Sequence, residues 1–184
     1  MKLTFRATRR ILGGSALVVA AALLPGTALA STAAPAGASW FAPRCTASQT
    51  VIWLGLGNGG GTAGTIFYPL EFSNTSKRTC TLFGFPRAWA LGPNGKQIGQ
   101  SSRQLNIRHR VVTLAPGATA HAQLGVIEAG NVCSKPVTAA SLKVRAPGQR
   151  GTTVLPFSFQ ACHGNKRVLV VGPVVPGVGI PGFP

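Results

Sequence analysis

Short segments in which apolar and polar side chains alternate are the feature that most constrains the fold of this chain. Between Ile66 and Phe72 every second residue is large and apolar, and the same period of two recurs between Ala118 and Val126. This period sends alternate side chains to opposite faces of a β-strand, so that one face can be buried. No segment keeps a helical period of about 3.6 residues over several turns. We therefore expect an all-β protein.

Turn residues divide the chain into pieces of strand length. The runs Pro93-Asn94-Gly95-Lys96 and Ala115-Pro116-Gly117 are typical of tight turns between antiparallel strands. This spacing favours two antiparallel sheets packed face to face, with about seven to nine strands. Besides the two alternating segments, strands are expected at residues 50–56, 88–91, 111–114, 142–145, 154–159 and 167–171.

Two further expectations concern side chains within the strands. Proline lacks a backbone donor, so Pro69 indicates an edge or a bulge at that point of its strand. Aromatic residues dominate core energetics, and those on the strand faces are expected to fill the space between the sheets. They are Trp53, Tyr68, Phe72, Trp89, Phe157 and Phe159.

Four cysteines form an even set, separated by 35, 53 and 29 residues. These gaps are too long for the closely spaced ligand pairs of a zinc site, whereas an exported chain forms disulfides by default. Two bridges are therefore expected. Spacing alone allows three connectivities, of which sequential pairing closes two short loops and contributes about 3 to 4 kcal/mol for each bridge. The four residues are Cys45, Cys80, Cys133 and Cys162.

The first 30 residues have the pattern of a secretory signal peptide. Basic residues, Arg9 and Arg10 among them, precede an apolar stretch at 11–24, and Ala28-Leu29-Ala30 fits a cleavage site. The apolar stretch is shorter than the roughly 20 residues that span a bilayer, so we expect cleavage after Ala30 and no transmembrane helix in the mature protein. A secreted or cell-wall-associated protein is predicted. Export by the Sec route is expected, with the twin-arginine route as the alternative.

The mature chain divides into three parts. Residues 31–40 are rich in Ala, Pro, Ser and Gly and are expected to form a flexible leader, residues 41–175 hold the strands and cysteines of a β-sandwich domain, and residues 176–184 form a Pro/Gly-rich tail. Residues 55–60 formally match the glycine pattern of dinucleotide sites. That site needs a following helix and an acidic residue about 20 positions later, and both are missing, so we expect a loop and no nucleotide cofactor.

Basic residues dominate the charge of the chain. It has 18 Lys and Arg against 2 acidic residues, a net charge of +16, and removal of the four basic residues of the signal peptide leaves +12. A net charge of this size creates a positive electrostatic field that attracts polyanions, which outside a cell are anionic envelope polymers or lipid head groups. The sequence contains no specific nucleic-acid motif. The alternative is a structural envelope protein in which charge only maintains solubility. Candidate anion-binding residues are Arg103, Arg108, Arg110, Lys143, Arg145, Arg150, Lys166 and Arg167.

Acidic residues are too few for most catalytic arrangements. Glu71 and Glu128 are the only carboxylate side chains, and the chain has no Gly-x-Ser-x-Gly nucleophile motif. We expect both glutamates to be solvated charges beside a Lys or Arg, and we expect a monomeric, non-catalytic binding module without cofactor or metal. A hydrolase using Glu71 or Glu128 is the alternative.

Three blocks of the sequence are similar to one exported actinobacterial family. They are Asn74-Thr75-Ser76, Cys80-Thr81-Leu82-Phe83-Gly84-Phe85-Pro86 and Thr113-Leu114-Ala115-Pro116-Gly117. Over roughly residues 45–175 the chain resembles the domain of unknown function 4232. This resemblance implies an immunoglobulin-like β-sandwich with sequential disulfides, Cys45 with Cys80 and Cys133 with Cys162. The family's activity is uncharacterised, so the resemblance assigns no catalytic residue.

Overall fold

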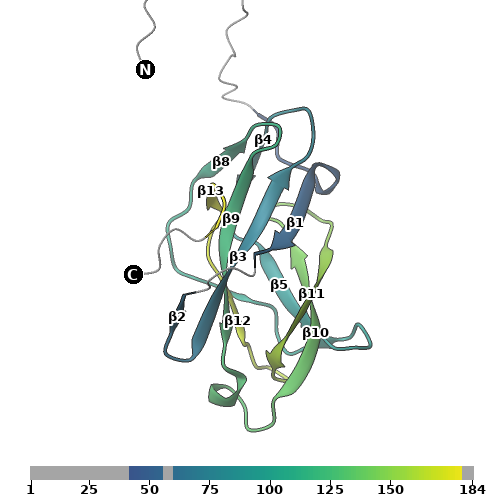
Figure 1. Cartoon of the computed structure of the whole chain (residues 1–184), viewed down its shortest axis with the longest axis vertical. Helices are drawn as coiled ribbons and strands as arrows, with labels where there is room; N and C mark the ends of the chain where they lie inside the picture. Colours follow the sequence, from purple (N-terminus) through teal and green to yellow (C-terminus); the bar gives the residue numbers. More distant parts are fainter. Residues whose placement is uncertain (1–41, 56–59, 180–184) are drawn as a thin grey trace, which may run out of the picture. The chain divides into compact units, whose positions relative to one another are not determined.

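The computed structural model describes residues 42–55 and 60–179, all of which belong to the unit Ser39–Pro184 (Figure 1). In these residues the regular structure consists of thirteen strands and two short 3-10 turns. Four of the strands have only two residues, and the other nine agree with the expected number. The elements are η1 Ala47–Gln49, β1 Thr50–Leu54, β2 Gly61–Thr62, β3 Thr65–Asn74, β4 Cys80–Phe83, β5 Arg87–Leu91, β6 Gln97–Ile98, β7 Arg103–Gln104, β8 Val111–Leu114, β9 Thr119–Ile127, η2 Ala129–Asn131, β10 Val137–Arg145, β11 Thr153–Ala161, β12 Leu169–Val171 and β13 Val175–Pro176.

Some sequence expectations fall outside the described residues. The signal peptide and the leader lie in residues 1–41, the middle of the glycine-rich loop is residues 56–59, and the last part of the tail is residues 180–184. In the part of the chain that the structure describes, no helix is long and apolar enough to cross a bilayer.

Two main sheets form the fold. The larger sheet has the strand order β1-β3-β9-β12-β7, with β2 beside β3 and β13 beside β9, and the smaller sheet has the order β11-β10-β5-β6. Strands β4 and β8 pair separately. The longest ladders, β3 with β9 and β10 with β11, are antiparallel, whereas the short pair of β12 and β7 is parallel. The all-β sandwich predicted from the alternating segments is confirmed.

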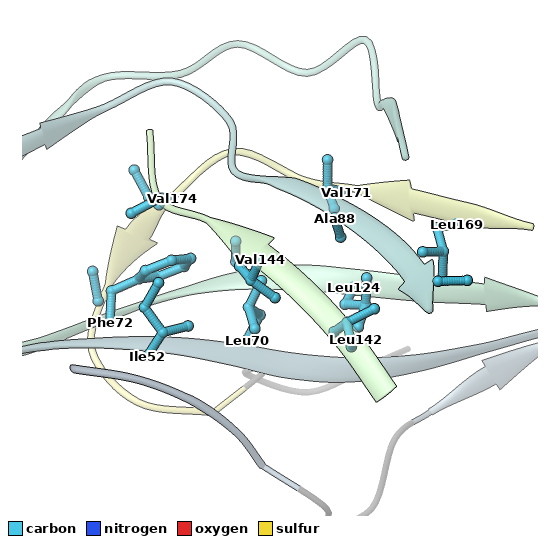
Figure 2. Packing of buried hydrophobic residues seen from close by; sticks show 14 of the residues in the cluster. Ile52, Leu70, Phe72, Ala88, Leu124, Leu142, Val144, Leu169, Val171 and Val174 are labelled. Carbon is cyan, nitrogen blue, oxygen red and sulfur yellow. The ribbon is translucent and has the colours of Figure 1, made fainter. Parts of the chain in front are cut away.

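The core lies between the inner faces of the two sheets (Figure 2). Leu70 and Phe72 on β3 are fully buried, as are Leu142 and Val144 on β10, and they point toward one another from opposite sheets. Burying a side chain of this size stabilises the fold by about 1.5 to 3 kcal/mol. The period of two in both strands is therefore the direct consequence of one buried and one outer face.

Aromatic residues contribute less to this core than predicted. Phe72 is fully buried, but Trp53 is 40% exposed. Trp89 lies on the outer face of β5, because its neighbours Ala88 and Ala90 occupy the inner face. The prediction for the two tryptophans was wrong, since alternation alone does not say which of two partly apolar faces turns inward. The remaining aromatic residues, Tyr68, Phe157 and Phe159, are half-buried.

Pro69 lies in a strand with neighbours on both sides, at the point where its pairing with β1 ends, so the predicted edge is present locally on that side. Strand β3 has β1 on one side and β9 on the other, and Pro69 pairs in regular register with Gln123 of β9. The last β1 pair joins Leu54 to Leu70, and the N–H of Gly55 donates to the carbonyl of Pro69 at 2.9 Å. The missing donor of Pro69 is tolerated because pairing with β1 ends at this point.

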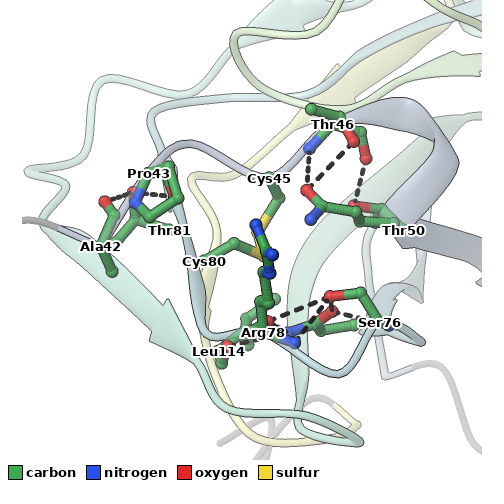
Figure 3. Close-up of a disulfide and its surroundings, with 12 residues drawn as sticks. Ala42, Pro43, Cys45, Thr46, Thr50, Ser76, Arg78, Cys80, Thr81 and Leu114 are labelled. Atoms are coloured by element: carbon green, nitrogen blue, oxygen red, sulfur yellow. Dashed lines mark hydrogen bonds between the residues drawn. A yellow bond between two sulfur atoms is a disulfide. The ribbon is translucent and has the colours of Figure 1, made fainter. Parts of the chain in front are cut away.

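Each disulfide joins two cysteines that follow one another in the order of cysteines along the chain, which is the sequential pairing that the family resemblance implied. Cys45 pairs with Cys80 across 35 residues, and Cys133 pairs with Cys162 across 29 residues. The first bridge ties the segment before β1 to the start of β4 (Figure 3). The N–H of Cys45 also donates to the Thr81 carbonyl at 2.9 Å. The second ties the residues after η2 to the residue that follows β11. Each bridge restricts the unfolded chain and contributes about 3 to 4 kcal/mol.

Candidate functional site

The outer face of strands β5 and β10 carries a group of basic side chains. Because Leu142 and Val144 of β10 point into the core, the alternate residues Lys143 and Arg145 point outward. Ala88 and Ala90 turn inward on β5 in the same way, and this places Arg87 and Trp89 on the outer face. We call Arg87, Trp89, Lys143 and Arg145 the basic face.

One tryptophan ring contacts two cations on this face. Lys143 lies directly opposite Trp89 in the β5–β10 register, with its Nζ 5.0 Å from the ring centroid. The guanidinium carbon of Arg145 lies 5.4 Å from the same centroid. A cation over an aromatic ring gains about 0.5 to 1 kcal/mol at an exposed site. Trp89 therefore holds both positive groups in fixed positions on the sheet.

The charge of the basic face has no internal counterpart. Arg145 lies directly opposite Arg87, an arrangement of like charges that weakens a sheet. The Nε of Arg145 is buried and has no hydrogen-bond partner among the described residues. Both acidic residues of the chain lie on other surfaces, as described below. An anion placed here would relieve the repulsion between the two guanidinium groups.

A shallow depression lies beside Lys143 on the same outer side of the sheet. Its volume is about 580 Å³, and its lining includes Ser141, Lys143, Val154 and Pro156 from β10 and β11. Residues of the turn after β5, such as Pro93, close its other side. The depression gives an extended ligand room to lie along the sheet next to the cations.

The other predicted basic residues lie apart from the basic face. Arg103 belongs to β7 and pairs with Val170 of β12 in the larger sheet, while Arg108 and Arg110 lie in the irregular segment before β8. Lys166 and Arg167 lie in the loop before β12, and the carbonyl of Lys166 accepts a hydrogen bond from Gln100 at 2.8 Å. All of these side chains and Arg150 are exposed. Of the predicted set, Lys143 and Arg145 are thus the pair that shares one aromatic platform.

A second aromatic contact accompanies Arg108 and Arg110. His109, between them in the sequence, lies 4.7 Å from the ring of Phe83 and 5.1 Å from that of Phe85. Phe83 is 49% exposed. Here the ring contacts involve the histidine, and no contact of either arginine with an aromatic ring is found in residues 42–55 and 60–179.

Glu71 is buried, so the prediction of a solvated charge beside a Lys or Arg was wrong for this residue. It lies on the outer face of β3, opposite His121 of β9, and is only 1% exposed. The C-terminal segment 175–179 covers it: the Gly179 N–H donates to Glu71 Oε1 at 2.6 Å, and His121 Nδ1 lies 2.9 Å from the Gly177 carbonyl. Burial raises the pKa of Glu71 above the usual 4.5, although the Gly179 hydrogen bond and the nearby His121 oppose this shift.

Glu128 is exposed, as predicted, at the end of β9. It lines a pocket of about 690 Å³ together with Ile66, Tyr68 and Phe159. The predicted Lys or Arg partner is not found, because Glu128 forms no ion pair with a Lys or Arg in the described chain. Instead, its Oε2 accepts a hydrogen bond from the Asn131 side chain at 3.5 Å. Glu71 and Glu128 therefore occupy two separate environments.

No group of three or more His, Cys, Asp or Glu side chains that could hold a metal ion occurs within the described ranges. Arg87 and Trp89 were missed as candidates for the anion site. A sequence signal existed, since Arg87 and Trp89 have the same i, i+2 spacing as Lys143 and Arg145, which places each pair on one face of a strand.

Comparison with known proteins gives one match. A protein family described as "Domain of unknown function (DUF4232)" matches residues 45–175. No curated protein and no solved structure matches the chain.

Proposed function

The chain belongs to the DUF4232 family, and from this premise we propose that it is a non-catalytic binding module whose basic face contacts phosphate-bearing polymers outside the cell. The family description names no activity, so the proposal depends on the physical properties of this chain. Without the four basic residues of the signal-peptide pattern its net charge is 16 − 4 = +12, with only two acidic residues, and this supports attraction of a polyanion over most of the surface.

The observation that carries the proposal is the contact of Lys143 and Arg145 with one ring of Trp89. Long side chains lose conformational entropy when they bind a ligand, at about 0.5 to 1.5 kcal/mol each. Trp89 orders both cations in advance, so less of this entropy is lost on binding. The uncompensated Arg87 opposite Arg145 adds a third positive group to the same face.

An extracellular location supports a polymer of the envelope as the partner. Two disulfides are compatible with an oxidising compartment, and the first 30 residues have the signal-peptide pattern. The shallow depression beside Lys143 gives room for an extended chain, and this favours a polymer over a single small anion. Lipid head groups carry the same phosphate chemistry and are the alternative source that the experiment separates.

Trp89→Leu tests the proposal because it removes the aromatic platform and leaves the net charge unchanged. Binding of a soluble polyphosphate of defined length would be measured by titration calorimetry for the wild type and the variant. We expect the variant to bind about tenfold more weakly, which is about 1.4 kcal/mol, because the two long side chains must then be ordered on binding at about 0.5 to 1.5 kcal/mol each. Equal affinity would contradict the proposal and favour the alternative of a structural protein whose charge only maintains solubility.

Vesicles complete the design, since they present phosphate as lipid head groups. We expect neutral vesicles not to bind, and we expect vesicles with an anionic lipid to bind less tightly than polyphosphate at equal phosphate concentration. Tighter binding to the anionic vesicles, with the same dependence on Trp89, would contradict the polymer as the partner while leaving the basic face as the site.

A further inference from the structure

One end of the sandwich opens between its two sheets into the pocket of about 690 Å³ that Glu128 lines. On β3, Ile66 and Tyr68 belong to the same face as the core residues Leu70 and Phe72, because all four have even positions in one strand. Across the pocket, Phe159 of β11 forms part of the opposite wall. The pocket is therefore a continuation of the apolar core that is left uncovered at this end.

Its lining is mainly apolar, with Thr62, Thr65, Ser158 and Gln160 as polar members besides Glu128. Tyr68 contacts Phe157 edge to face, with ring centroids 4.9 Å apart, and Phe157 contacts Phe159 at 5.2 Å. Ile66 is 51% exposed within this lining. Covering such a side chain with an apolar group is favourable by about 25 cal/mol for each Å² removed from water. A mainly apolar pocket with some polar groups in its lining is the usual form of a small-molecule site.

The charge at this pocket is the reverse of that elsewhere on the surface. The chain has two acidic residues, and Glu71 is buried beneath the C-terminal segment, so Glu128 is the exposed carboxylate side chain of the described residues. Its N–H donates to the Gly64 carbonyl at 2.7 Å, which fixes the backbone beside the pocket. No Lys or Arg lines the pocket; Lys135 is the neighbour in sequence of the lining residue Pro136 and forms no ion pair with Glu128.

We propose that this pocket binds organic cations with an apolar body, with the ammonium group at Glu128 and the body against Ile66, Tyr68 and Phe159. A carboxylate at the rim repels anions and attracts cations, and aromatic side chains add cation–π attraction when an ammonium group lies over a ring face. The wider positive field is screened beyond about 8 Å at physiological salt, so Glu128 decides the local preference. This site is independent of the basic face and does not rest on the function proposed for it.

Tyr68 provides a direct readout because it is the only tyrosine of the chain. Protein labelled with 3-fluorotyrosine has a single ¹⁹F resonance, which reports on the pocket. Three probes of similar shape would be titrated: 2-phenylethylammonium, the neutral 2-phenylethanol and the anionic 3-phenylpropionate. We expect the cation to shift the resonance with saturation and to bind about fivefold more tightly than the alcohol, as for an exposed ion pair near the upper limit of its usual strength. We expect the anion to bind most weakly.

Glu128→Gln is the matched variant, since the side chain is exposed and keeps its size. It should reduce the affinity for the cation about fivefold and leave that for the alcohol unchanged. Ile66→Ser should weaken all three probes, while Lys143→Gln with Arg145→Gln should weaken none. Equal binding of cation and alcohol, unchanged cation binding in Glu128→Gln, or no shift with any probe at millimolar concentration would each overturn the proposal. None of these outcomes bears on the polyphosphate titrations, so the two proposals fail separately.

Discussion

A glutamate and a histidine that lie opposite each other on the outer face of the larger sheet are buried, whereas a lysine and an arginine on the outer face of the smaller sheet are partly exposed. On the larger sheet, Glu71 and His121 are paired across β3 and β9 and are covered by the chain's own segment 175–179. On the smaller sheet, Lys143 and Arg145 contact one tryptophan ring and remain partly exposed. On the first face the chain's own backbone binds Glu71 Oε1 and His121, although Glu71 Oε2 is buried without a hydrogen-bond partner among the described residues. The second face leaves its positive charge without a counter-charge in the described chain.

This difference separates residues that stabilise the fold from residues available to a ligand. The buried pair holds β13 against β9, where Val175 pairs with His121 (Figure 1). Removing one member of such a pair leaves the other polar group buried without its partner. An exposed cation, in contrast, is solvated in the absence of a ligand and contributes little to stability. The comparison therefore predicts that substitutions on the covered face lower stability strongly and that substitutions on the open face lower it little.

His121→Ala should give the largest effect. The Gly177 carbonyl loses its hydrogen bond, Glu71 loses the nearby imidazole, and a cavity forms under the C-terminal segment. We expect the free energy of unfolding to fall by about 3 kcal/mol. Chemical denaturation measures this directly, with His163→Ala, an exposed histidine, as the matched control that should change it by less than about 0.5 kcal/mol. Equal losses in both variants would contradict the distinction between the faces.

Glu71→Gln should change the pH dependence of stability. Because burial raises the pKa of Glu71, the folded state binds its proton more tightly than the unfolded state. The stability that the protonated carboxyl contributes is fully present below the ordinary pKa of 4.5 and is lost as the pH rises through the raised pKa. A tenfold change in proton affinity corresponds to about 1.4 kcal/mol.

Thermal melts at a series of pH values from about 4 to about 8, a range that begins below the ordinary pKa of Glu71 and continues above it, test this prediction. The wild type should lose stability relative to Glu71→Gln as the pH increases above 4.5, because the glutamine side chain stays neutral. A wild type that gains stability relative to the variant over the same range would show that the carboxylate, rather than the carboxyl group, is the favoured form under the segment.

Lys143→Gln combined with Arg145→Gln should have the smallest effect on stability. Two cation–π contacts are lost, but the repulsion between Arg145 and Arg87 is relieved. We expect the free energy of unfolding to change by less than about 1 kcal/mol. A loss as large as that of His121→Ala would mean that the two cations are structural, and that the open face resembles the covered one.

The sequence pattern predicted the strands well where one face is strictly apolar. The expected strand at residues 111–114 coincides with β8, and the alternation between Ile66 and Phe72 lies within β3. It failed where both faces carry apolar atoms: Trp89 was assigned to the core, although the small residues Ala88 and Ala90 fill the inner positions. Side-chain size rather than hydrophobicity decides such cases, because the inner face must fit the opposite sheet.

The candidate site was predictable only in part. Composition and spacing identified Lys143 and Arg145, but their positions opposite Trp89 and Arg87 depend on the register between β5 and β10, which pairs residues 54 and 58 positions apart in the chain. The burial of Glu71 likewise depends on a distant segment, 108 residues away along the chain at Gly179. Long-range register of this kind has no local signal in the sequence.

The salt dependence of polyphosphate binding tests the central claim most directly. Counterion release makes log K fall with log salt by about 0.7 to 0.9 for each phosphate contact. Two variants of equal charge would be compared with the wild type: Lys143→Gln with Arg145→Gln, and Arg108→Gln with Arg110→Gln. The account predicts that the first reduces the slope by about 1.4 to 1.8 and that the second leaves it unchanged. Equal reductions in both would show that binding depends on total charge and would contradict a site on the basic face.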